Sequence, residues 1–568
     1  MPATLLCAAS LFSAPAASAD TIDRAAMREV LRSQARASAA GPLPLPLPET
    51  DAAPRAAAAS ATELAAIARD QGPAGLLVGV RSHPDRPRVA AKLEGLGAEV
   101  EQFPLIGVLA ARVPSGAAAA AALRHDRRVA YVERDRKLRV AADPFDRVDP
   151  ASGIKFTWFY DEVRAGQAIA AAGGGSSRTV AVIDTGIDVN HPEFGGSARI
   201  ARTFDTNTRG TSVPDAIGHG TFVGGLIAAI DGNGIGAKGV AGNTRLIAVR
   251  ASRDGFFEAS DLIRGITFAI RSRADVLNMS LAGRGISLSQ ARALGSAFYN
   301  DVLPVAASGN RAQVGNPLEF PAAALGGPRG RTGIGLSVAA TNPNGGVAPF
   351  SNHNRYVSLA APGDGPSGCQ FGVFSTLPAT LGTDWDGSCS GIFVAGGARY
   401  GYAEGTSFAA PIAAGIAALT WQVERRLASE QVAAVLARSA RQTIGRGWNE
   451  FTGAGIVDGA AAAALARVYD VTAPRARGTA RRLGASVRVR LRRSRDRTER
   501  GRRLAGGVRY GLLVSRNAGR RFDQIGPRQR SPISATVPLR GRRPNLLMAI
   551  ACDRNGNCGV KRLGRYRL

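Results

Sequence analysis

This chain of 568 residues has few aromatic side chains and few cysteines, and it lacks a long apolar run beyond its N-terminal region. Aromatic residues make up only 6% of the sequence. The absence of a later run of about 18 uninterrupted apolar residues argues against a membrane span. Apolar residues still make up 45%, so the chain can form two to four domains with packed cores.

Acidic residues are scarce only near the C-terminus. The formal net charge is +28, and residues 475–568 alone hold 27 Lys and Arg against 4 Asp and Glu. Such a charge first suggests a nucleic-acid binder, but this segment lacks the interleaved aromatic residues that stack on bases. We expect it to bind an anionic cell-wall polymer or simply to keep the protein soluble, and we expect a monomer.

The five cysteines show no CxxC spacing of the kind that binds zinc. Cys7 lies in the N-terminal apolar stretch, and the other four form two local pairs, Cys369 with Cys389 and Cys552 with Cys558. Loss of Cys7 with a signal peptide would leave an even number, which suits an oxidising compartment. We therefore predict two disulfides, with four free buried thiols as the alternative.

The N-terminus has the pattern of a signal peptide, although the usual basic start is missing. Leu5 to Ala17 form an apolar stretch, and Ala17-Ser-Ala19 offers small residues at a cleavage site. We predict that residues 1–19 are removed and that the protein is secreted, either extracellular or associated with the cell wall.

Two segments come before the main domain. Residues 20–73 are rich in Ala and Pro, and a Pro-Leu repeat at 41–48 favours an extended linker over a packed core. Residues 74–140 alternate three apolar strand patterns with two short helical patterns. Two β-α-β units of this length predict a ferredoxin-like α+β module.

Residues 145–470 alternate short apolar strands with helices. Strands that are apolar throughout fit a parallel sheet covered on both faces, so we predict an α/β domain. The predicted strands are 179–183, 245–249, 275–279, 302–306 and 336–340. Beyond Pro474, alternation such as Val487-Arg-Val-Arg-Leu491 predicts a small β-sandwich-like domain at 475–568.

Three short motifs place reactive side chains at the ends of predicted strands or the starts of predicted helices. Asp184 follows an apolar strand, at the sheet edge where active sites of α/β folds gather. His219 and Ser407 each begin a predicted helix, and backbone N–H groups near Ser407 can stabilise an oxyanion. Each residue also has a structural alternative: a turn for Asp184, a buried polar side chain for His219 and a helix cap for Ser407. Asp-Thr-Gly also occurs in aspartic peptidases, but the second such motif that they need is absent.

Taken together, the motifs closely resemble the three signature segments of subtilisin-like serine peptidases, in that family's order. They are Val182-Ile-Asp-Thr-Gly-Ile-Asp188, His219-Gly-Thr221 and Gly405-Thr-Ser-Phe-Ala-Ala-Pro411. The resemblance spans about 145–470. Supporting segments begin at Asn278, Ala306, Phe320, Phe350 and Ala360.

The resemblance implies a secreted serine endopeptidase that cuts peptide bonds through an acyl-enzyme intermediate. Ser407 would attack the carbonyl carbon, His219 would take its proton, and Asp184 would hold the imidazole in the required tautomer. Asn310 would donate its side-chain amide to the oxyanion, with a plain turn residue as the alternative. A relative that only binds peptides is the competing functional class, and the presence of all four residues argues against it.

By the same resemblance, two segments form the walls of the S1 pocket, which receives the substrate residue (P1) before the cut bond. The predicted substrate-binding residues are Ser280, Leu281, Ala282, Gly283, Ala307 and Gly309. These residues are small or apolar, and no acidic residue is placed to demand a basic P1 side chain. We therefore expect broad tolerance that leans toward apolar P1 side chains.

The module at 74–140 resembles the family's inhibitory propeptide, which the enzyme itself cuts away, here between 140 and 150. The partners implied are protein or peptide substrates and the protein's own propeptide. The chemistry requires no cofactor. Asp188 matches a position that often binds calcium in the family, and the loop 231–236 could add oxygen ligands, with an ordinary turn as the alternative.

Overall fold

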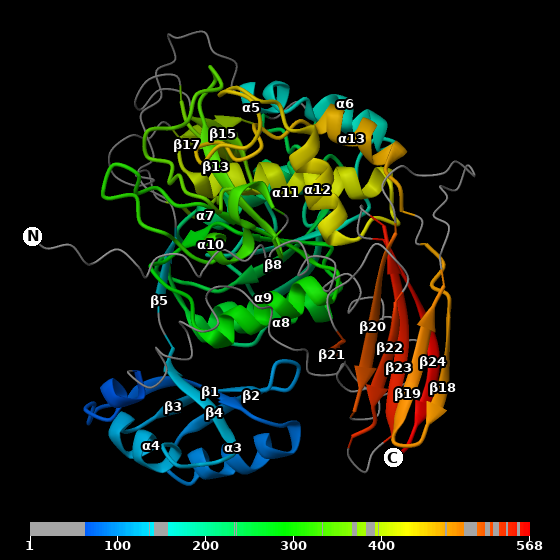
Figure 1. Cartoon of the computed structure of the whole chain (residues 1–568). Helices are drawn as coiled ribbons and strands as arrows, with labels where there is room; N and C mark the ends of the chain where they lie inside the picture. The colour runs from blue at the N-terminus through cyan, green and yellow to red at the C-terminus, as the bar shows by residue number, and fades with distance from the viewer. Residues whose placement is uncertain are drawn as a thin grey trace, which may run out of the picture. The chain divides into compact units, whose positions relative to one another are not determined.

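A computed structural model describes most of the chain from residue 63 onward, and Figure 1 labels its helices and strands. The described residues are 63–135, 137–140, 157–231, 233, 236–331, 333–365, 372–381, 392–395, 397–471, 474–492, 508–516, 523–525, 533–540, 544–553 and 557–568. The described residues divide into two compact units, one that ends at Tyr469 and one formed by Asp470–Leu568.

The main domain is built on a seven-stranded sheet in which all neighbouring strands are parallel, which confirms the predicted α/β fold (Figure 1). From one edge to the other, the strands are β14 (Leu359–Pro362), β13 (Leu336–Thr341), β12 (Leu303–Ala307), β10 (Val276–Met279), β6 (Thr179–Asp184), β8 (Arg245–Arg250) and β7 (Ile200–Asp205). The inner strands are buried almost throughout because helices cover the sheet on both faces.

Helices α8 and α9 share one apolar core with strands of this sheet. Helices α7 and α11 contact each other and other parts of the same strands, and their residues do not belong to that core. The helices of the domain are α5 (Trp158–Glu162), α6 (Ala165–Ala171), α7 (His219–Ala228), α8 (Ala259–Arg271), α9 (Leu288–Tyr299), α10 (Ala322–Leu325), α11 (Thr406–Val423), α12 (Ser429–Ser439) and α13 (Gly459–Val468). Its described residues also form two small antiparallel sheets. One has the order β11 (Leu281–Ala282), β5 (Lys137–Val140) and β9 (Phe256–Glu258), and the other has the order β15 (Val373–Leu377), β17 (Ala398–Ala403) and β16 (Phe393–Ala395).

Among the described residues, α11 alone is long and apolar enough to cross a membrane. Within the protein, however, 89% of its membrane-length window is buried. Every residue from Thr406 to Trp421 is buried, which is typical of the central helix of a globular domain.

A four-stranded antiparallel sheet with two helices precedes the main domain, in the order β-α-β-β-α-β. Its elements are β1 (Ala74–Val80), α3 (Arg86–Glu94), β2 (Glu99–Phe103), β3 (Val108–Val113), α4 (Gly116–Leu123) and β4 (Val129–Arg134), and the sheet order is β2-β3-β1-β4. The predicted start at residue 74 is too late. Residues 63–67 are helical, and Ile67 is fully buried in the same core as Leu76 and Leu93.

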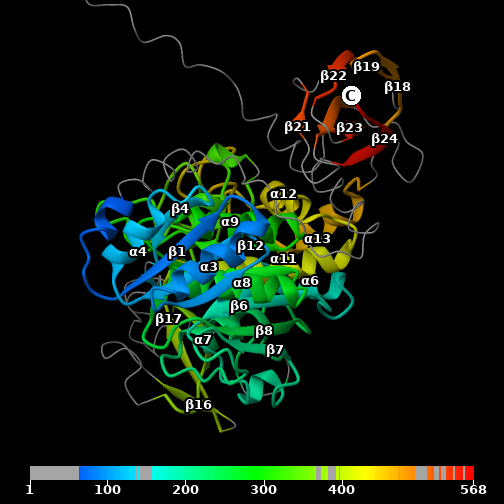
Figure 2. The same ribbon diagram turned by 90° about the horizontal axis from the view of Figure 1, so that it is seen from below.

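The C-terminal unit contains two antiparallel sheets that face each other across one core (Figure 2). Its strands are β18 (Gly478–Leu483), β19 (Ser486–Leu491) and β22 (Ser534–Pro538) in one sheet, and β21 (Asp523–Gln524), β20 (Arg509–Ser515), β23 (Asn545–Cys552) and β24 (Cys558–Tyr566) in the other. Cys552 and Cys558, one of the two predicted pairs, form a disulfide. Cys369 and Cys389 lie outside the described residues.

Candidate active site

Asp184 lies where the order of the parallel strands changes direction. It ends β6, with β8 and β7 on one side of that strand and β10 on the other. In open α/β sheets, such a switch point leaves a crevice at the carboxyl ends of the strands, where ligands bind. The Asp184 carboxylate is buried, and its Oδ1 accepts a hydrogen bond from Thr185 N at 2.8 Å.

His219 is joined directly to this carboxylate. It is the first residue of α7, and its Nδ1 lies 2.7 Å from Asp184 Oδ1. Gly220 permits the close approach, because a Cβ there would collide with the carbonyl oxygen of Gly186. The other ring nitrogen, Nε2, is buried and has no hydrogen-bond partner in the described part of the chain. Because an unpaired buried nitrogen is costly, this atom is a candidate for a functional proton acceptor.

Asp215, which the sequence reading did not single out, fixes the turn that carries His219. Its buried carboxylate accepts hydrogen bonds from Gly218 N and Thr221 N, both at 2.8 Å, and from Thr185 Oγ1 at 2.9 Å. Burial raises the pKa of Asp215, and the hydrogen bonds from Thr221 and Gly218 oppose that shift. Its position four residues before the histidine was the one signal that the sequence offered.

Ser407 is the second residue of α11 and is also fully buried. Its Oγ donates a 3.3 Å hydrogen bond to the carbonyl oxygen of Ser280, and none joins it to His219. The His219 ring packs against the ring of Phe408, with centroids 5.4 Å apart. The structure thus brings Asp184 and His219 together. Ser407 directly precedes Phe408, whose ring His219 contacts, and the Ser407 hydroxyl points toward Ser280.

Asn310 is held at the start of the same helix. Its Oδ1 accepts hydrogen bonds from Thr406 N at 2.9 Å and from Thr406 Oγ1 at 2.7 Å. Its Nδ2 lies near Gly405, since a Cβ on that glycine would be 3.1 Å from this nitrogen. The amide is therefore fixed close to Ser407 in a defined orientation.

The six predicted substrate-binding residues lie in two segments close to Ser407. Ser280 Oγ donates a 2.5 Å hydrogen bond to the carbonyl oxygen of Ser407, and Gly309 N donates a 3.1 Å bond to Thr406 Oγ1. The first segment follows β10 and comprises Ser280, Leu281, Ala282 and Gly283, and the second, at the end of β12, contains Ala307 and Gly309.

An extended strand of the chain itself lies along the first segment. β5 pairs antiparallel with both β11 and β9. Val140, the last residue of β5, is opposite Leu281, and the residue before Leu281 is Ser280, which is hydrogen-bonded to Ser407. This is the arrangement of strand addition, by which proteins bind extended peptides.

The module before the main domain also contacts α8 and α9 at their N-termini. Glu133 accepts hydrogen bonds from Leu288 N at 3.0 Å and Ser289 N at 2.9 Å, at the start of α9. Asp135 accepts one from Ser260 N at 2.5 Å, at the start of α8. Carboxylates at these positions satisfy unpaired N–H groups and interact favourably with the helix dipole.

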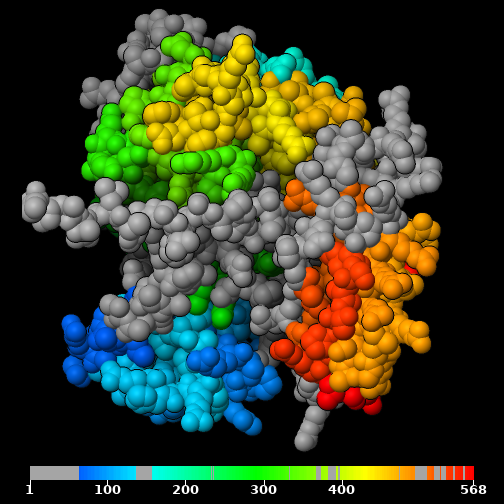
Figure 3. All heavy atoms as spheres, viewed as in Figure 1, coloured from blue at the N-terminus to red at the C-terminus, as the bar shows by residue number. Residues whose placement is uncertain are grey.

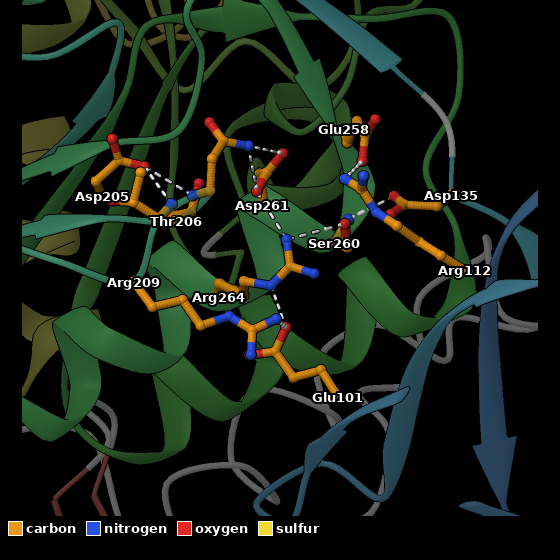
Figure 4. A network of polar contacts seen from close by, with 12 residues as sticks. Glu101, Arg112, Asp135, Asp205, Thr206, Arg209, Glu258, Ser260, Asp261 and Arg264 are labelled. Carbon is orange, nitrogen blue, oxygen red and sulfur yellow. Dashed lines mark hydrogen bonds and ion pairs between the residues drawn. The ribbon is translucent and has the colours of Figure 1, made fainter. Parts of the chain in front are cut away.

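A network of charged side chains extends this contact (Figure 4). Glu101 of β2 forms an ion pair with Arg264 of α8. The same arginine also pairs with Asp261, with 2.8 Å between Arg264 Nη1 and Asp261 Oδ1. The network borders a cavity of about 320 Å³ between the module and the main domain. Burial raises the pKa of Asp135 to about 7, and the charges of Glu258 and Asp261 add to the shift.

The predicted calcium site at Asp188 and the loop 231–236 lies only partly within the described residues. No group of three or more His, Cys, Asp or Glu side chains that could hold a metal occurs among them. Both oxygens of Asp188 accept backbone hydrogen bonds, and Asp231 pairs with Lys238 at 2.9 Å. Residues 232, 234 and 235 of the loop lie outside the described part, and calcium binding there stays a prediction.

One acidic residue near the predicted S1 walls was missed. The carboxylate of Glu319 lies against Gly309, because a Cβ on that glycine would collide with Glu319 Oε2. Glu319 was not among the predicted substrate-binding residues. Glu319 directly precedes the Phe320-Pro-Ala322 segment noted above, and that position could have identified it.

Comparison with known proteins agrees with the family resemblance. The family model described as the subtilase family matches residues 175–455, which include Asp184, His219 and Ser407. The chain is 32% identical over 266 residues to the thermophilic serine proteinase of Bacillus sp. (strain AK1), and the match covers 46% of this chain and 57% of that protein.

Two further relatives cover more of this chain. Fervidolysin of Fervidobacterium pennivorans is 30% identical over 314 residues, which is 53% of this chain and 42% of fervidolysin. Subtilisin E of Bacillus subtilis (strain 168) is 31% identical over 326 residues, which is 54% of this chain and 71% of subtilisin E. The chain thus spans about half the length of the thermophilic proteinase and of fervidolysin, and more than two thirds of subtilisin E.

Proposed function

Because the chain belongs to the subtilase family, we propose that it is a serine endopeptidase in which Asp184, His219 and Ser407 act as the catalytic triad. The observation that carries the proposal is the buried hydrogen bond between Asp184 and His219, which leaves His219 Nε2 unpaired. That nitrogen belongs to a ring that packs against the residue following Ser407. A non-catalytic peptide binder would have no need of this arrangement.

In the proposed reaction, Ser407 Oγ attacks the carbonyl carbon of the substrate while its proton passes to His219 Nε2. The imidazolium then gives this proton to the leaving amine, and an acyl-enzyme remains on Ser407. A water molecule reverses the sequence, releasing the acid and restoring the serine. Asp184 keeps the proton on Nδ1, so that Nε2 is the basic nitrogen, and it stabilises the charged ring.

Negative charge on the substrate oxygen needs donors that are in place beforehand. Ser407 is the second residue of α11, so its backbone N–H belongs to the unpaired first turn of a helix. We assign the second donor to Asn310, whose amide oxygen is engaged by Thr406. Its amide nitrogen, which lies near Gly405, is the donor atom that we assign to the oxyanion.

A direct test is hydrolysis of casein by the purified, processed protein, with and without a sulfonyl fluoride that modifies activated serines. The proposal requires hydrolysis that the inhibitor abolishes. A folded, processed chain that hydrolyses neither casein nor short peptides would refute it.

We further propose that residues 63–140 are an inhibitory prodomain, that the enzyme cuts itself between 140 and 150, and that residues 1–19 direct secretion. The position of β5 supports the first two points, since its backbone pairs with β11 in the manner of strand addition and its last residue, Val140, lies opposite the residue after Ser280. The buried state of Ser407 and His219 agrees with a covered site.

The affinity of this prodomain for the main domain is expected to fall as the pH rises from about 4 to about 7. The pKa of Asp135 is 3.8 ordinarily and about 7 in the contact, so the bound form keeps a proton that the free form releases. The affinity is therefore highest below pH 3.8, where both forms carry the proton. It falls by up to about tenfold per pH unit between pH 3.8 and about 7, and above that it stays at its lowest level.

Asp135→Asn should remove most of this slope and leave the part due to Glu133, whose pKa burial also raises. The fraction of cleaved prodomain that co-elutes with the enzyme in gel filtration measures the effect. The prediction is contradicted if lowering the pH from about 7 to about 4 releases the prodomain and Asp135→Asn does so equally.

A second function is favoured by one face of the C-terminal unit. Arg477, Arg481, Arg488, Arg490 and Arg492, here called the arginine ladder, are all exposed on the outer side of β18 and β19. Figure 3 shows the surface of these strands, in orange. Arg481 is directly opposite Arg488, and Arg492 N bonds to the carbonyl oxygen of Arg477. Like charges opposed across strands destabilise a sheet, and none of these five makes an ion pair with a described residue.

We infer that the arginine ladder binds an anionic cell-wall polymer. Residues two apart on a strand are separated by about 7 Å, so Arg488, Arg490 and Arg492 repeat positive charge at this spacing, while Arg477 and Arg481 are four residues apart, about 14 Å. Thr479, Ser534 and Thr536 lie opposite arginines of the ladder on the neighbouring strands. They are small and hydroxylated, so they offer no aromatic rings on which bases could stack. A phosphate- or carboxylate-bearing polymer fits this surface better than nucleic acid does.

Replacing Arg481, Arg488 and Arg490 by Gln is expected to lower the salt concentration that elutes the full chain from an anionic polymer. Replacing Arg562, Arg565 and Arg567 by Gln is the matched control, because these residues are exposed on the other sheet and the charge change is equal. Equal effects of the two triple variants would mean that net charge alone decides retention. Tighter binding to single-stranded DNA than to the polymer would favour the nucleic-acid alternative.

A further inference from the structure

Glu319 is a buried acidic residue between the two predicted S1 walls. It is 5% exposed. The next residue, Phe320, exchanges two backbone hydrogen bonds with Gly283, the last residue of the first wall. On the other side, the carboxylate lies against Gly309, which belongs to the second wall. Gly309 has φ of 108°, a conformation that suits glycine, and a side chain there would displace Glu319 Oε2.

This location is close to the proposed nucleophile. Gly309 N donates to Thr406 Oγ1, and Thr406 directly precedes Ser407. Gly309 is also followed by Asn310, the proposed oxyanion donor. A P1 side chain that extends from the reacting carbonyl between the two walls would therefore meet the Glu319 carboxylate.

The carboxylate has few partners of its own. It accepts no hydrogen bond from any described residue, and its one ion pair, with Arg311, is long at 3.8 Å and involves a partly exposed arginine. Burial raises the pKa of Glu319, although the charges of Arg311 and Arg284 oppose the shift. A buried carboxylate with unused acceptor sites is costly to the folded protein, which makes it well suited to receive an incoming cation.

We propose that Glu319 selects substrates with Arg or Lys at P1, by accepting hydrogen bonds from the guanidinium or ammonium group. The inference rests on the proposed peptidase function and replaces the expectation of an apolar P1. Arginine would gain most, because its planar donors can engage both carboxylate oxygens. Hydrogen bonds to charged groups in such sites change affinity by about 10- to 100-fold.

The test uses the processed enzyme and two peptides that differ only in P1, Arg against Met, which is also unbranched. The wild-type enzyme should show a kcat/KM about 10- to 100-fold higher for the Arg peptide. In Glu319→Gln, kcat/KM for the Arg peptide should fall and remove this advantage, while kcat/KM for the Met peptide should not change. Glu450→Gln, which removes the same charge from an exposed position, should leave the ratio unchanged.

Two results would overturn the inference. One is a wild-type preference for Met that Glu319→Gln does not alter. The other is an equal loss for both peptides in Glu319→Gln and in Arg311→Gln, which would mean that the pair only supports the fold. If wild type cleaves neither peptide nor casein, the proposed peptidase function fails instead, so the two failures are distinct.

Discussion

Ser407→Ala is expected to lower the rate of peptide hydrolysis by about 10⁶-fold and to leave the chain uncut after β5. The size of the loss is that seen when the nucleophile of a serine triad is removed, because no acyl-enzyme can form. Folding should be unaffected, since the hydroxyl makes one weak 3.3 Å hydrogen bond. Intact mass and casein hydrolysis, measured on protein from a host that lacks other proteases, report both effects.

Each half of this result can fail separately. If Ser407→Ala is inactive on added substrate but its N-terminal segment is still removed, self-processing is wrong and another protease matures the chain. If the variant hydrolyses casein at the wild-type rate, Ser407 is not the nucleophile. Ser177→Ala, at an exposed serine, serves as the control and should behave as wild type.

Asp184→Asn is expected to lower kcat by about 10⁴-fold with little change in KM or in unfolding temperature. The asparagine would present an N–H where Oδ1 now faces His219 Nδ1 at 2.7 Å. The imidazole would then carry its proton on Nε2, the nitrogen that must accept the proton of Ser407.

Steady-state kinetics on a short peptide, together with thermal unfolding, separate this loss from misfolding. Asp161→Asn makes the same chemical change at an exposed residue and should retain full activity. A higher KM with an unchanged kcat would show that Asp184 acts on substrate affinity and not on the histidine.

The central strands could be predicted because their apolar content is dictated by burial on both faces. Leu303–Ala307 and Leu336–Thr341 are buried throughout, and both agree with the predicted ranges to within one residue at each end. The edge strand Ile200–Asp205 was not predicted, because it is mostly half-buried and carries Arg202 and Thr203. Glu99–Phe103, the edge of the small sheet, was missed for the same reason.

The candidate site divides in a similar way. Asp184, His219 and Ser407 could be identified because glycines and small residues around them form recognisable segments. Asp215 and Glu319 were not identified, because their roles arise from folding and their positions beside a recognised segment were the only signals in the sequence. Asp215 acts through bonds to the turn before α7, and Glu319 through contact with Gly309. Single acidic residues in loops carry no pattern that distinguishes such contacts from solvent exposure.

The central claim is that Asp184 and His219 activate the hydroxyl of Ser407. Labelling of the processed enzyme with a fluorophosphonate, followed by peptide mass analysis, tests it most directly because only an activated serine reacts quickly. The account predicts modification at Ser407 that is lost in His219→Ala and slowed in Asp184→Asn. Modification of a different serine, or equal labelling of Ser407 in all three proteins, would contradict it.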